Sequence, residues 1–281
     1  MIVCDLDGTL ISRAHTISEA DQRAIAEARR LGLQVTICTG RSTRESLDII
    51  APLGLTGEGV FVTGATISSL ADGKTRVARG LAPDLVMELV DFFAQFGHAV
   101  LLLVDTPAPG GIHYVITSHG PIHAATEEWL LRNKMQATLL NEMEACRAGV
   151  ILRAGIVVNL PQSPRIVGEL EAKFAGRACF LALRAPLFDC HVIEVFAADV
   201  NKWTGVKGLC RRMGLDPQSV VTIGDDVNDM SMLRGAALSF AMDNAAPEVK
   251  AAAKRTTLTQ SQNGVAAAIA SVLEECAAHR G

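Results

Sequence analysis

The sequence predicts an α/β protein with a doubly wound, Rossmann-like parallel sheet that is interrupted by an inserted α+β cap domain. Near the N-terminus, short apolar strands alternate with amphipathic helices, as crossover connections between parallel strands require. The same alternation returns after about residue 190. Between these stretches the pattern changes to hairpins and mixed elements. We therefore expect a core of residues 1–81 and 190–281 and a cap of residues 82–189.

The first half of the core is expected to alternate strand and helix. Three short apolar runs bounded by turn residues predict buried strands, at residues 1–4, 34–38 and 60–63. Two amphipathic stretches between them predict crossover helices, at residues 20–31 and from Ser42 or Thr43 toward Leu53. Ser18 is suited to cap the first helix, and Gly32 is suited to end it.

In the middle of the chain the pattern changes, first at the end of the core segment and then in the expected cap. The turn Ala71-Asp72-Gly73-Lys74 joins two short strands into a hairpin, and Pro83 begins a helix that runs to Phe96. Mixed helices and strands follow up to about Asp189. The core then resumes with further elements, expected as helices at 202–213, 246–253 and 265–278 and strands at 220–223 and 238–242.

Composition excludes several classes of protein. The net charge is −4 and no basic stripe offsets it, which argues against nucleic acid as a partner. No apolar stretch approaches the ~20 residues that a membrane span needs, and no secretion signal is visible. The seven cysteines are scattered, without a Cys-x-x-Cys pair, as is typical of reduced core residues. We therefore expect a cytoplasmic protein, and its oligomeric state stays open.

Acidic residues follow two of the predicted core strands. Asp5 and Asp7 come after the first strand, and Asp225 and Asp229 come after the strand at 220–223. Ligands of open parallel sheets bind at the carboxyl ends of the strands. Two carboxylates ~4 Å apart repel by roughly 4 kcal/mol at an effective dielectric near 20, so such a site needs a cation or a proton. Asp5-x-Asp7 thus predicts one carboxylate kept ionised, as nucleophile or metal ligand, and one that carries a proton.

The spacing of Asp225 and Asp229 adds to this cluster. If a helical turn begins at Asp226, both carboxylates point to one side, and Asn228 is placed to hydrogen-bond one of them. One lysine cannot neutralise three or four acids, so a hard cation such as Mg²⁺ fits better. The alternative is an exposed turn and helix cap without chemistry. The segment that carries Asp225 and Asp229 is expected at the same sheet edge as Asp5, which argues against that alternative.

Four motifs in this order resemble those of the haloacid dehalogenase superfamily, in its phosphatase branch. They are Asp5-Leu6-Asp7-Gly8-Thr9, Thr39-Gly40-Arg41, Asn201-Lys202 and Gly224-Asp225-Asp226-x-Asn228-Asp229. The large insertion, the Ile193-Glu194-Val195 run and Ala241-Met242-x-Asn244-Ala245 further resemble the Cof-type members, whose cap is of the large α/β kind. The resemblance covers the whole core, and in the cap it is one of architecture alone.

The resemblance implies hydrolysis through an aspartyl-phosphate. Asp5 would attack phosphorus, and Asp7 would protonate the leaving alcohol and then take a proton from water. Thr39 and the backbone N–H of Gly40 would hold the phosphoryl oxygens, and Lys202 would offset charge. The implied Mg²⁺ ligands are Asp5, the main-chain carbonyl of Asp7, Asp225 and, through water, Asp229.

The implied phosphate- and substrate-binding residues include one departure from the family pattern. Cof-type members commonly have Asn-Gly-Ala where this chain has Thr63-Gly64-Ala65, which puts substrate orientation in question. Arg41 either reaches the phosphate or forms a local salt bridge. The whole expected set is Gly40, Arg41, Thr63, Gly64, Asn228 and Asn244.

His113, His119 and His123 offer an alternative metal site. Gly120-Pro121 breaks the helix that would align the last two histidines, which argues against a metal there. The alternative is that these histidines belong to the substrate-facing part of the cap, together with Tyr114, Arg184 and Asp189.

These features predict an Mg²⁺-dependent phosphatase of a small phosphorylated metabolite. Sugar phosphates are the leading substrate class by analogy, followed by phosphorylated cofactors such as pyridoxal phosphate or flavin mononucleotide. One alternative is a phosphomutase or phosphotransferase, in which a sugar hydroxyl replaces water as the acceptor. Another is a phosphate-sensing regulatory module in which phosphorylated Asp5 persists.

Overall fold

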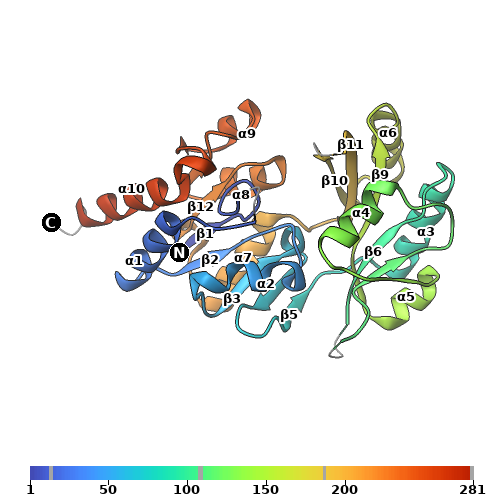
Figure 1. Ribbon diagram of the computed structural model, residues 1–281, viewed down its shortest axis with the longest axis horizontal. Coiled ribbons are helices and arrows are strands. Elements are labelled where there is room, and N and C mark those ends of the chain that lie inside the picture. Colours follow the sequence, from blue (N-terminus) through green and yellow to red (C-terminus); the bar gives the residue numbers. More distant parts are fainter. Residues whose placement is uncertain (13–14, 107–109, 186–187, 279–281) are drawn as a thin grey trace. The chain divides into compact units, whose positions relative to one another are not determined.

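The computed structural model describes residues 1–12, 15–106, 110–185 and 188–278 (Figure 1). The chain divides into two compact units. Unit 1 comprises Met1–Val77 and Asn201–Gly281, and unit 2 comprises Ala78–Val200. Within the described ranges, no helix combines the length and the apolar composition that crossing a membrane requires.

Unit 1 is built on a five-stranded parallel sheet. Its strand order is β14-β13-β12-β1-β2, so the N-terminal strand β1 lies between β12 and β2. The predicted fold class, an α/β protein with a parallel core sheet and a cap, is confirmed. The strands are β1 (Ile2–Cys4), β2 (Val35–Ile37), β12 (Val221–Gly224), β13 (Leu238–Ala241) and β14 (Arg255–Thr256).

The helices of unit 1 connect these strands. Ser18 caps α1, since its side chain accepts a hydrogen bond from the backbone N–H of Asp21. The buried carboxylate of Asp21 in turn accepts a hydrogen bond from the backbone N–H of Ala266, which ties α1 to α10. The α-helices are α1 (Glu19–Arg30), α2 (Thr43–Ile50), α7 (Lys202–Met213), α8 (Met230–Gly235), α9 (Pro247–Ala252) and α10 (Gly264–Ala278).

The third strand departs from the expectation. β3 (Glu58–Phe61) does not join the parallel sheet as a full strand, because it pairs antiparallel with β4 (Thr66–Ser69) in a three-stranded sheet completed by β5 (Thr75–Ala78). One parallel bridge, between Cys38 and Val60, joins it to the segment after β2. The cause is a sharp reversal at the 3₁₀ turn η2 (Val62–Gly64), whose Val62 and Thr63 adopt left-handed φ values of 50° and 57°.

Unit 2 is a six-stranded, mostly antiparallel sheet with helices. The strand order is β10-β11-β9-β6-β7-β8, and only the β7–β8 pair among these strands is parallel. Apolar side chains of one sheet face pack with α3, α5 and α6. The elements are α3 (Pro83–Ala94), β6 (Leu101–Asp105), β7 (Tyr114–Ile116), α4 (Ala124–Arg132), β8 (Ala137–Leu139), α5 (Glu142–Ala148), β9 (Val150–Asn159), α6 (Ser163–Phe174), β10 (Ala178–Ala185) and β11 (Cys190–Ala197).

The boundaries of unit 2 differ from those expected at 82 and 189. Strand β11 was expected in the core, but it pairs with β9 and β10 in the sheet of unit 2. The apolar residues of β11 suit either sheet, and the hairpin that β11 forms with β10 places it in the sheet of unit 2. The chain returns to unit 1 at Asn201, and it leaves unit 1 after Val77.

Candidate active site

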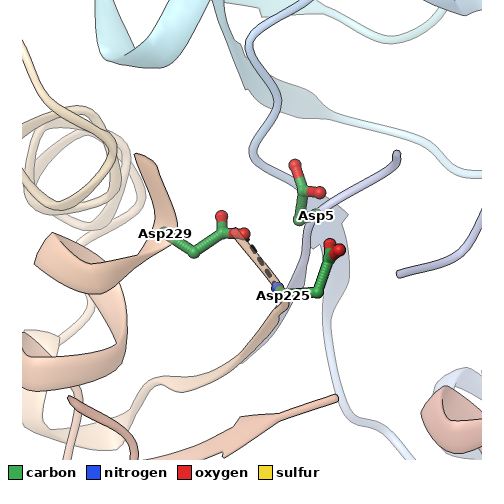
Figure 2. Close-up of side chains that lie close together, drawn as sticks. All are labelled: Asp5, Asp225 and Asp229. Atoms are coloured by element: carbon green, nitrogen blue, oxygen red, sulfur yellow. Dashed lines mark hydrogen bonds between the residues drawn. The ribbon is translucent and has the colours of Figure 1, made fainter. Parts of the chain in front are cut away.

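Three carboxylates that are distant in the sequence converge at one edge of the unit 1 sheet. Ligand atoms of Asp5, Asp225 and Asp229 all lie within 4.8 Å of one another (Figure 2). Asp5 follows β1 and Asp225 follows β12, and the parallel register places these strand ends side by side. The backbone N–H of Asp5 donates to the carbonyl of Ile223 over 2.9 Å. Among the described residues, these three aspartates form the one group of three or more acidic, histidine or cysteine side chains close enough together to hold a metal ion.

Asp229 organises the loop that follows β12. It ends the short 3₁₀ helix η4 (Val227–Asp229), which Asp226 caps. Its buried Oδ2 accepts hydrogen bonds from the backbone N–H groups of Asp225 at 2.9 Å and Asp226 at 3.0 Å. The first of these bonds is the dashed line in Figure 2. Gly224 is required beside it, because a Cβ there would lie 2.5 Å from Cγ of Asp229.

Lys202 joins two of the three acids. It is the first residue of α7, which Asn201 caps by accepting a hydrogen bond from the backbone N–H of Thr204. Its fully buried Nζ lies 2.6 Å from Oδ1 of Asp5 and 2.5 Å from Oδ1 of Asp229. Burial acts to lower the pKa of Lys202, but the two carboxylates outweigh burial and raise that pKa. One cation thus faces three acids, and the cluster keeps an excess of negative charge.

This excess appears in the pKa values of the acids. Burial, followed by the charge of Asp229, raises the pKa of Asp5 well above its usual value, although Lys202 opposes the shift. The same two causes raise the pKa of Asp225 to about 7, while a 2.8 Å hydrogen bond from Thr9 Oγ1 opposes them. A proton or a cation therefore stabilises the cluster near neutral pH. The carboxylate oxygens fit a hard divalent ion such as Mg²⁺.

Gly8 lets the loop after β1 approach Asp225. It has a left-handed φ of 76°, and a Cβ there would lie 2.1 Å from Oδ2 of Asp225. Gly32 offers a matched control, because its φ is 88° and a Cβ there would meet nothing within 4 Å.

We expect Gly8→Ala to lower the free energy of unfolding more than Gly32→Ala does. Both variants bear the strain of a left-handed alanine, about 1–2 kcal/mol. Only Gly8→Ala must also displace the carboxylate of Asp225. Urea denaturation of the two variants and the wild type measures the difference, and equal losses would contradict the close approach.

Arg41 forms the local salt bridge, one of the two roles that the sequence left open for it. Its Nε donates to Oδ2 of Asp7 over 2.7 Å, and its Nη2 donates to Oδ1 of Asp7 over 2.6 Å. Burial opposes the shift, but the hydrogen bonds to Asp7 raise the pKa of Arg41. The side chain of Asp7 is 55% exposed and lies outside the group of converging carboxylates.

Polar atoms without partners gather around Gly40. A Cβ at Gly40 would lie 3.5 Å from Oγ1 of Thr63 and 3.6 Å from Nδ2 of Asn228. The buried Oγ1 of Thr63 and Oδ1 of Asn228 have no hydrogen-bond partner in the described part of the chain. The neighbouring Thr39 is buried, and its Oγ1 accepts a hydrogen bond from the backbone N–H of Arg41. Such orphaned atoms indicate a place where water or a ligand oxygen binds.

The expectation that Asn228 hydrogen-bonds a carboxylate is wrong for the described residues. Oδ1 of Asp229 contacts Lys202, and Oδ2 of Asp229 accepts two backbone N–H groups. Oδ1 and Oδ2 of Asp225 accept hydrogen bonds from Thr9 and Asn244. These groups hold the two carboxylates in place of Asn228.

Two residues expected to bind substrate also hold the loops of the site in place. Gly64 has a φ of 101° and packs against α7, where a Cβ would lie 2.2 Å from the carbonyl oxygen of Asn201. Asn244 donates from Nδ2 to the carbonyl of Gly8 at 3.0 Å and to Asp225 at 3.3 Å. Its Oδ1 accepts the backbone N–H of Gln260. In this structure both residues therefore position the loops that carry the acids.

Thr9 contacts the carboxylate cluster, although sequence reasoning gave it no role. Its side chain is buried and donates to Oδ1 of Asp225. The available signal was a hydroxyl residue directly after the Asp7-Gly8 turn, at a strand end that faces another acid.

The residues of the alternative metal site do not converge. His123 caps α4, where Nδ1 accepts a hydrogen bond from the backbone N–H of Ala125, and its Nε2 lies 3.2 Å from Oδ1 of Asn159. His119 lies 3.7 Å from a carboxylate oxygen of Glu142. The ring of His113 packs edge-on against Tyr114. Arg184 and Asp189 form an exposed ion pair.

Comparisons with known proteins show the family of the chain. The sequence model of a family described as haloacid dehalogenase-like hydrolase matches residues 2–269. A Bacillus subtilis protein named 5-amino-6-(5-phospho-D-ribitylamino)uracil phosphatase YitU is 28% identical over 268 residues, which cover 95% of this chain and 94% of that protein. An Arabidopsis thaliana protein named chloroplastic endoribonuclease YBEY is 27% identical over 95% of this chain, and the match spans 45% of the length of that relative.

Solved structures share the fold. A putative HAD/COF-like hydrolase from Plasmodium vivax superposes with a TM-score of 0.79 at 21% identity, covering 97% of this chain and 95% of that one. A haloacid dehalogenase-like hydrolase from Bacteroides thetaiotaomicron superposes with a TM-score of 0.75 at 24% identity, covering 96% and 98%. The resemblance that the four motifs carry is thus confirmed, and the chain belongs to the haloacid dehalogenase-like hydrolase family.

Proposed function

We propose that the protein is an Mg²⁺-dependent phosphatase that hydrolyses a small phosphorylated metabolite through an aspartyl-phosphate on Asp5. The observation that carries the proposal is the buried Lys202, which contacts both Asp5 and Asp229 within a cluster of three carboxylates. This contact fixes one oxygen of Asp5 at the sheet edge. A fixed carboxylate oxygen is what nucleophilic attack on a phosphoryl group requires.

The residues that would hold Mg²⁺ are Asp5, Asp225 and Asp229, with the main-chain carbonyl of Asp7 as a further predicted ligand. Bound there, Mg²⁺ supplies positive charge that lowers the repulsion between the acids and a phosphoryl group. Asp229 also keeps the loop after β12 in place through its two backbone hydrogen bonds. Lys202 balances charge on the side of the nucleophile.

The residues around Gly40 would bind the phosphoryl oxygens. The orphaned Oγ1 of Thr63 and the amide of Asn228 flank Gly40, next to the buried Thr39. A hydroxyl, an amide and a backbone N–H offer the donors that phosphoryl oxygens need. This placement also gives Thr63 a role at the position where Cof-type relatives commonly have asparagine.

Asp7 would act as the general acid and base. Arg41 donates to both of its oxygens. A carboxylate accepts about four hydrogen bonds, so Asp7 keeps lone pairs that can receive a proton while it is paired. The pairing fixes the orientation of the Asp7 side chain, which is half exposed.

The leading substrate class is a sugar phosphate or sugar-alcohol phosphate. YitU and two further relatives from Bacillus subtilis carry the name 5-amino-6-(5-phospho-D-ribitylamino)uracil phosphatase, and their named substrate is a phosphate ester of a sugar alcohol. Each of them covers most of this chain at 24–28% identity.

Release of inorganic phosphate tests the proposal. The purified protein is incubated with p-nitrophenyl phosphate and with pentose and hexose phosphates, in Mg²⁺ and in excess EDTA. We expect turnover in Mg²⁺, a loss of at least about tenfold in EDTA, and recovery when Mg²⁺ is restored. A protein that releases no phosphate in Mg²⁺, or that is indifferent to EDTA, contradicts the proposal. Chromatography of the products separates hydrolysis from phosphoryl transfer to a second sugar.

The raised pKa of Asp225 predicts how the metal-free protein responds to pH. Folded Asp225 has a pKa of about 7, above that of an unfolded aspartate. Between about pH 4 and pH 7 the folded state therefore keeps a proton on Asp225 that the unfolded state has released. The free energy of unfolding should therefore fall as pH rises from about 4 to 7. Asp5 shifts in the same direction and adds to the effect.

Thermal unfolding at pH 5.5 and pH 8, with and without Mg²⁺, measures this response. We expect Mg²⁺ to raise the melting temperature more at pH 8, where the cluster has lost its protons and the cation replaces them. Asp225→Asn should reduce the difference between the two pH values, and Asp5 accounts for the part that remains. Equal Mg²⁺ effects at both pH values in the wild type would contradict the charged cluster.

A further inference from the structure

The segment between β1 and α1 brings a histidine close to Arg41. Ile11 and Ile17 form an antiparallel bridge in this segment, and both of their side chains are buried. His15 lies between them in the sequence, and its backbone N–H donates to the carbonyl of Ser12 over 2.9 Å. The loop that carries His15 is therefore tied to unit 1 at its base.

The backbone of His15 adopts a left-handed φ of 58°. Residues other than glycine seldom take such a φ, because it brings Cβ close to a backbone carbonyl oxygen. A turn alone would be served better by glycine, which takes this φ without strain. Strained residues of this kind cluster at functional sites, so the contacts of the His15 side chain need an explanation.

The imidazole of His15 contacts the guanidinium of Arg41. Nδ1 of His15 lies 3.5 Å from Nη2 of Arg41, and the same Nη2 donates to Oδ1 of Asp7 over 2.6 Å. A guanidinium donates hydrogen bonds and accepts none, so Nδ1 of His15 is the acceptor and the ring proton lies on Nε2. The three side chains therefore form a chain of contacts that ends at the proposed general acid and base.

The guanidinium of Arg41 has partners along its whole outline. Nε and Nη2 donate to Asp7, Nη1 donates to the carbonyl of Glu45 over 3.4 Å, and Nη2 also contacts His15. The five N–H groups of a guanidinium lie in one plane, so partners at both Nη atoms fix the orientation of that plane. The carboxylate of Asp7 needs such support, because the side chain is 55% exposed. The contact with His15 thus helps to set the direction in which Asp7 is held.

We propose that His15 is a positioning residue, which acts through Arg41 to orient the carboxylate of Asp7 toward the oxygen of the leaving group. The inference rests on the proposed phosphatase function, in which Asp7 protonates the leaving alcohol. Proton transfer needs hydrogen-bond reach and alignment, so a loosely held Asp7 transfers its proton less efficiently. Loss of His15 therefore slows most the esters whose leaving group needs that proton.

Two aryl esters of related shape measure this need. Phenolate is a poorer leaving group than p-nitrophenolate, so phenyl phosphate depends more on general-acid catalysis. For a reaction through an aspartyl-phosphate, kcat/KM reports the steps up to release of the alcohol, which are the steps that Asp7 assists as an acid. Neither ester carries a sugar, so a direct contact between His15 and a sugar does not affect the comparison.

His15→Gly removes the imidazole and also the backbone strain, so it tests the side chain alone. We expect kcat/KM to fall about tenfold or more for phenyl phosphate and by at most about threefold for p-nitrophenyl phosphate. His15→Asn should keep both values within about threefold of the wild type, because asparagine takes a left-handed φ readily and its Oδ1 replaces Nδ1 as the acceptor. Lys134→Gly is the matched control and should change neither value, since Lys134 is exposed in unit 2 and has a φ of 54°.

NMR of the guanidinium nitrogens of Arg41, assigned by their loss in Arg41→Lys, provides a second readout that needs no turnover. We expect hindered rotation of the guanidinium in the wild type, His15→Asn and Lys134→Gly, and faster rotation in His15→Gly. If the spectra follow this pattern while neither ester is hydrolysed, the phosphatase proposal fails and the positioning of Arg41 by His15 stands. If His15→Gly slows both esters equally or neither, if His15→Asn loses as much as His15→Gly, or if the rotation of Arg41 is unchanged, the inference is overturned.

Discussion

Asp5→Asn is expected to abolish turnover of p-nitrophenyl phosphate, with a loss in kcat of at least about 10³-fold, because the amide cannot act as the nucleophile. The change keeps the size and shape of the side chain. It also removes one of the three negative charges that crowd the site. The free energy of unfolding should therefore fall little, and Lys202 keeps its contact with Asp229.

Steady-state kinetics and urea denaturation of the same preparation measure both effects. Asp72→Asn is the control, since Asp72 lies in the exposed turn between β4 and β5. A folded Asp5→Asn protein that keeps a near-normal rate rules out the nucleophile. An Asp5→Asn protein that does not fold would show that the carboxylate of Asp5 is required for folding.

Lys202→Met is expected to cost about 3–5 kcal/mol of the free energy of unfolding, because it leaves buried carboxylates without their cation. The side chain of Lys202 is fully buried, and both of its partners are nearly so. Methionine fills a similar volume, so the loss reports charge rather than a cavity. Activity should disappear as well, since the oxygen of Asp5 is no longer held in place.

Urea denaturation with and without Mg²⁺ tests this expectation. Lys250→Met is the matched control, because Lys250 pairs with Asp243 at the surface and such pairs contribute about 0–1 kcal/mol. Added Mg²⁺ should recover part of the stability of Lys202→Met and change Lys250→Met no more than the wild type. Equal losses in the two variants would show that the buried pair is not what stabilises this edge of the sheet.

The convergence of the acids could be predicted because it depends on strand ends. Asp5 and Asp225 each follow a short apolar run, and parallel strands end at the same edge. The role of Lys202 could be predicted only from the family resemblance. A lysine at the start of a helix carries no sequence signal that its side chain is buried between carboxylates. The Arg41–Asp7 pair joins residues 34 apart, and no spacing rule favours that partner over the phosphate.

Backbone geometry explains where the fold departs from prediction. Val62 and Thr63 adopt left-handed conformations that β-branched residues rarely take, so nothing in the sequence predicts the reversal that turns β3 away from the parallel sheet. Strand β11 has the apolar pattern of a core strand, and only its hairpin with β10 assigns it to unit 2. The substrate-binding roles of Gly64 and Asn244, which were expected from their motifs, stay predictions. Their contacts with Asn201 and Gly8 depend on loop geometry that motifs do not encode.

The buried Arg153–Glu194 ion pair of unit 2 was also outside the reach of sequence reasoning. Glu194 is part of the Ile193-Glu194-Val195 run that resembles Cof-type members, and no pattern in the sequence assigns a role to Arg153. Their pairing depends on the β9–β11 register, which the hydrophobic pattern alone does not fix between two candidate partner strands.

Chemical trapping tests the central claim most directly. The protein is mixed with substrate and Mg²⁺, quenched in acid during turnover and treated with borohydride, which reduces an aspartyl-phosphate to homoserine. Peptide mass spectrometry then locates the modified residue. We expect homoserine at position 5 in the wild type and none in Asp5→Asn. A modified residue at any other position, or an unmodified protein during active turnover, would contradict it.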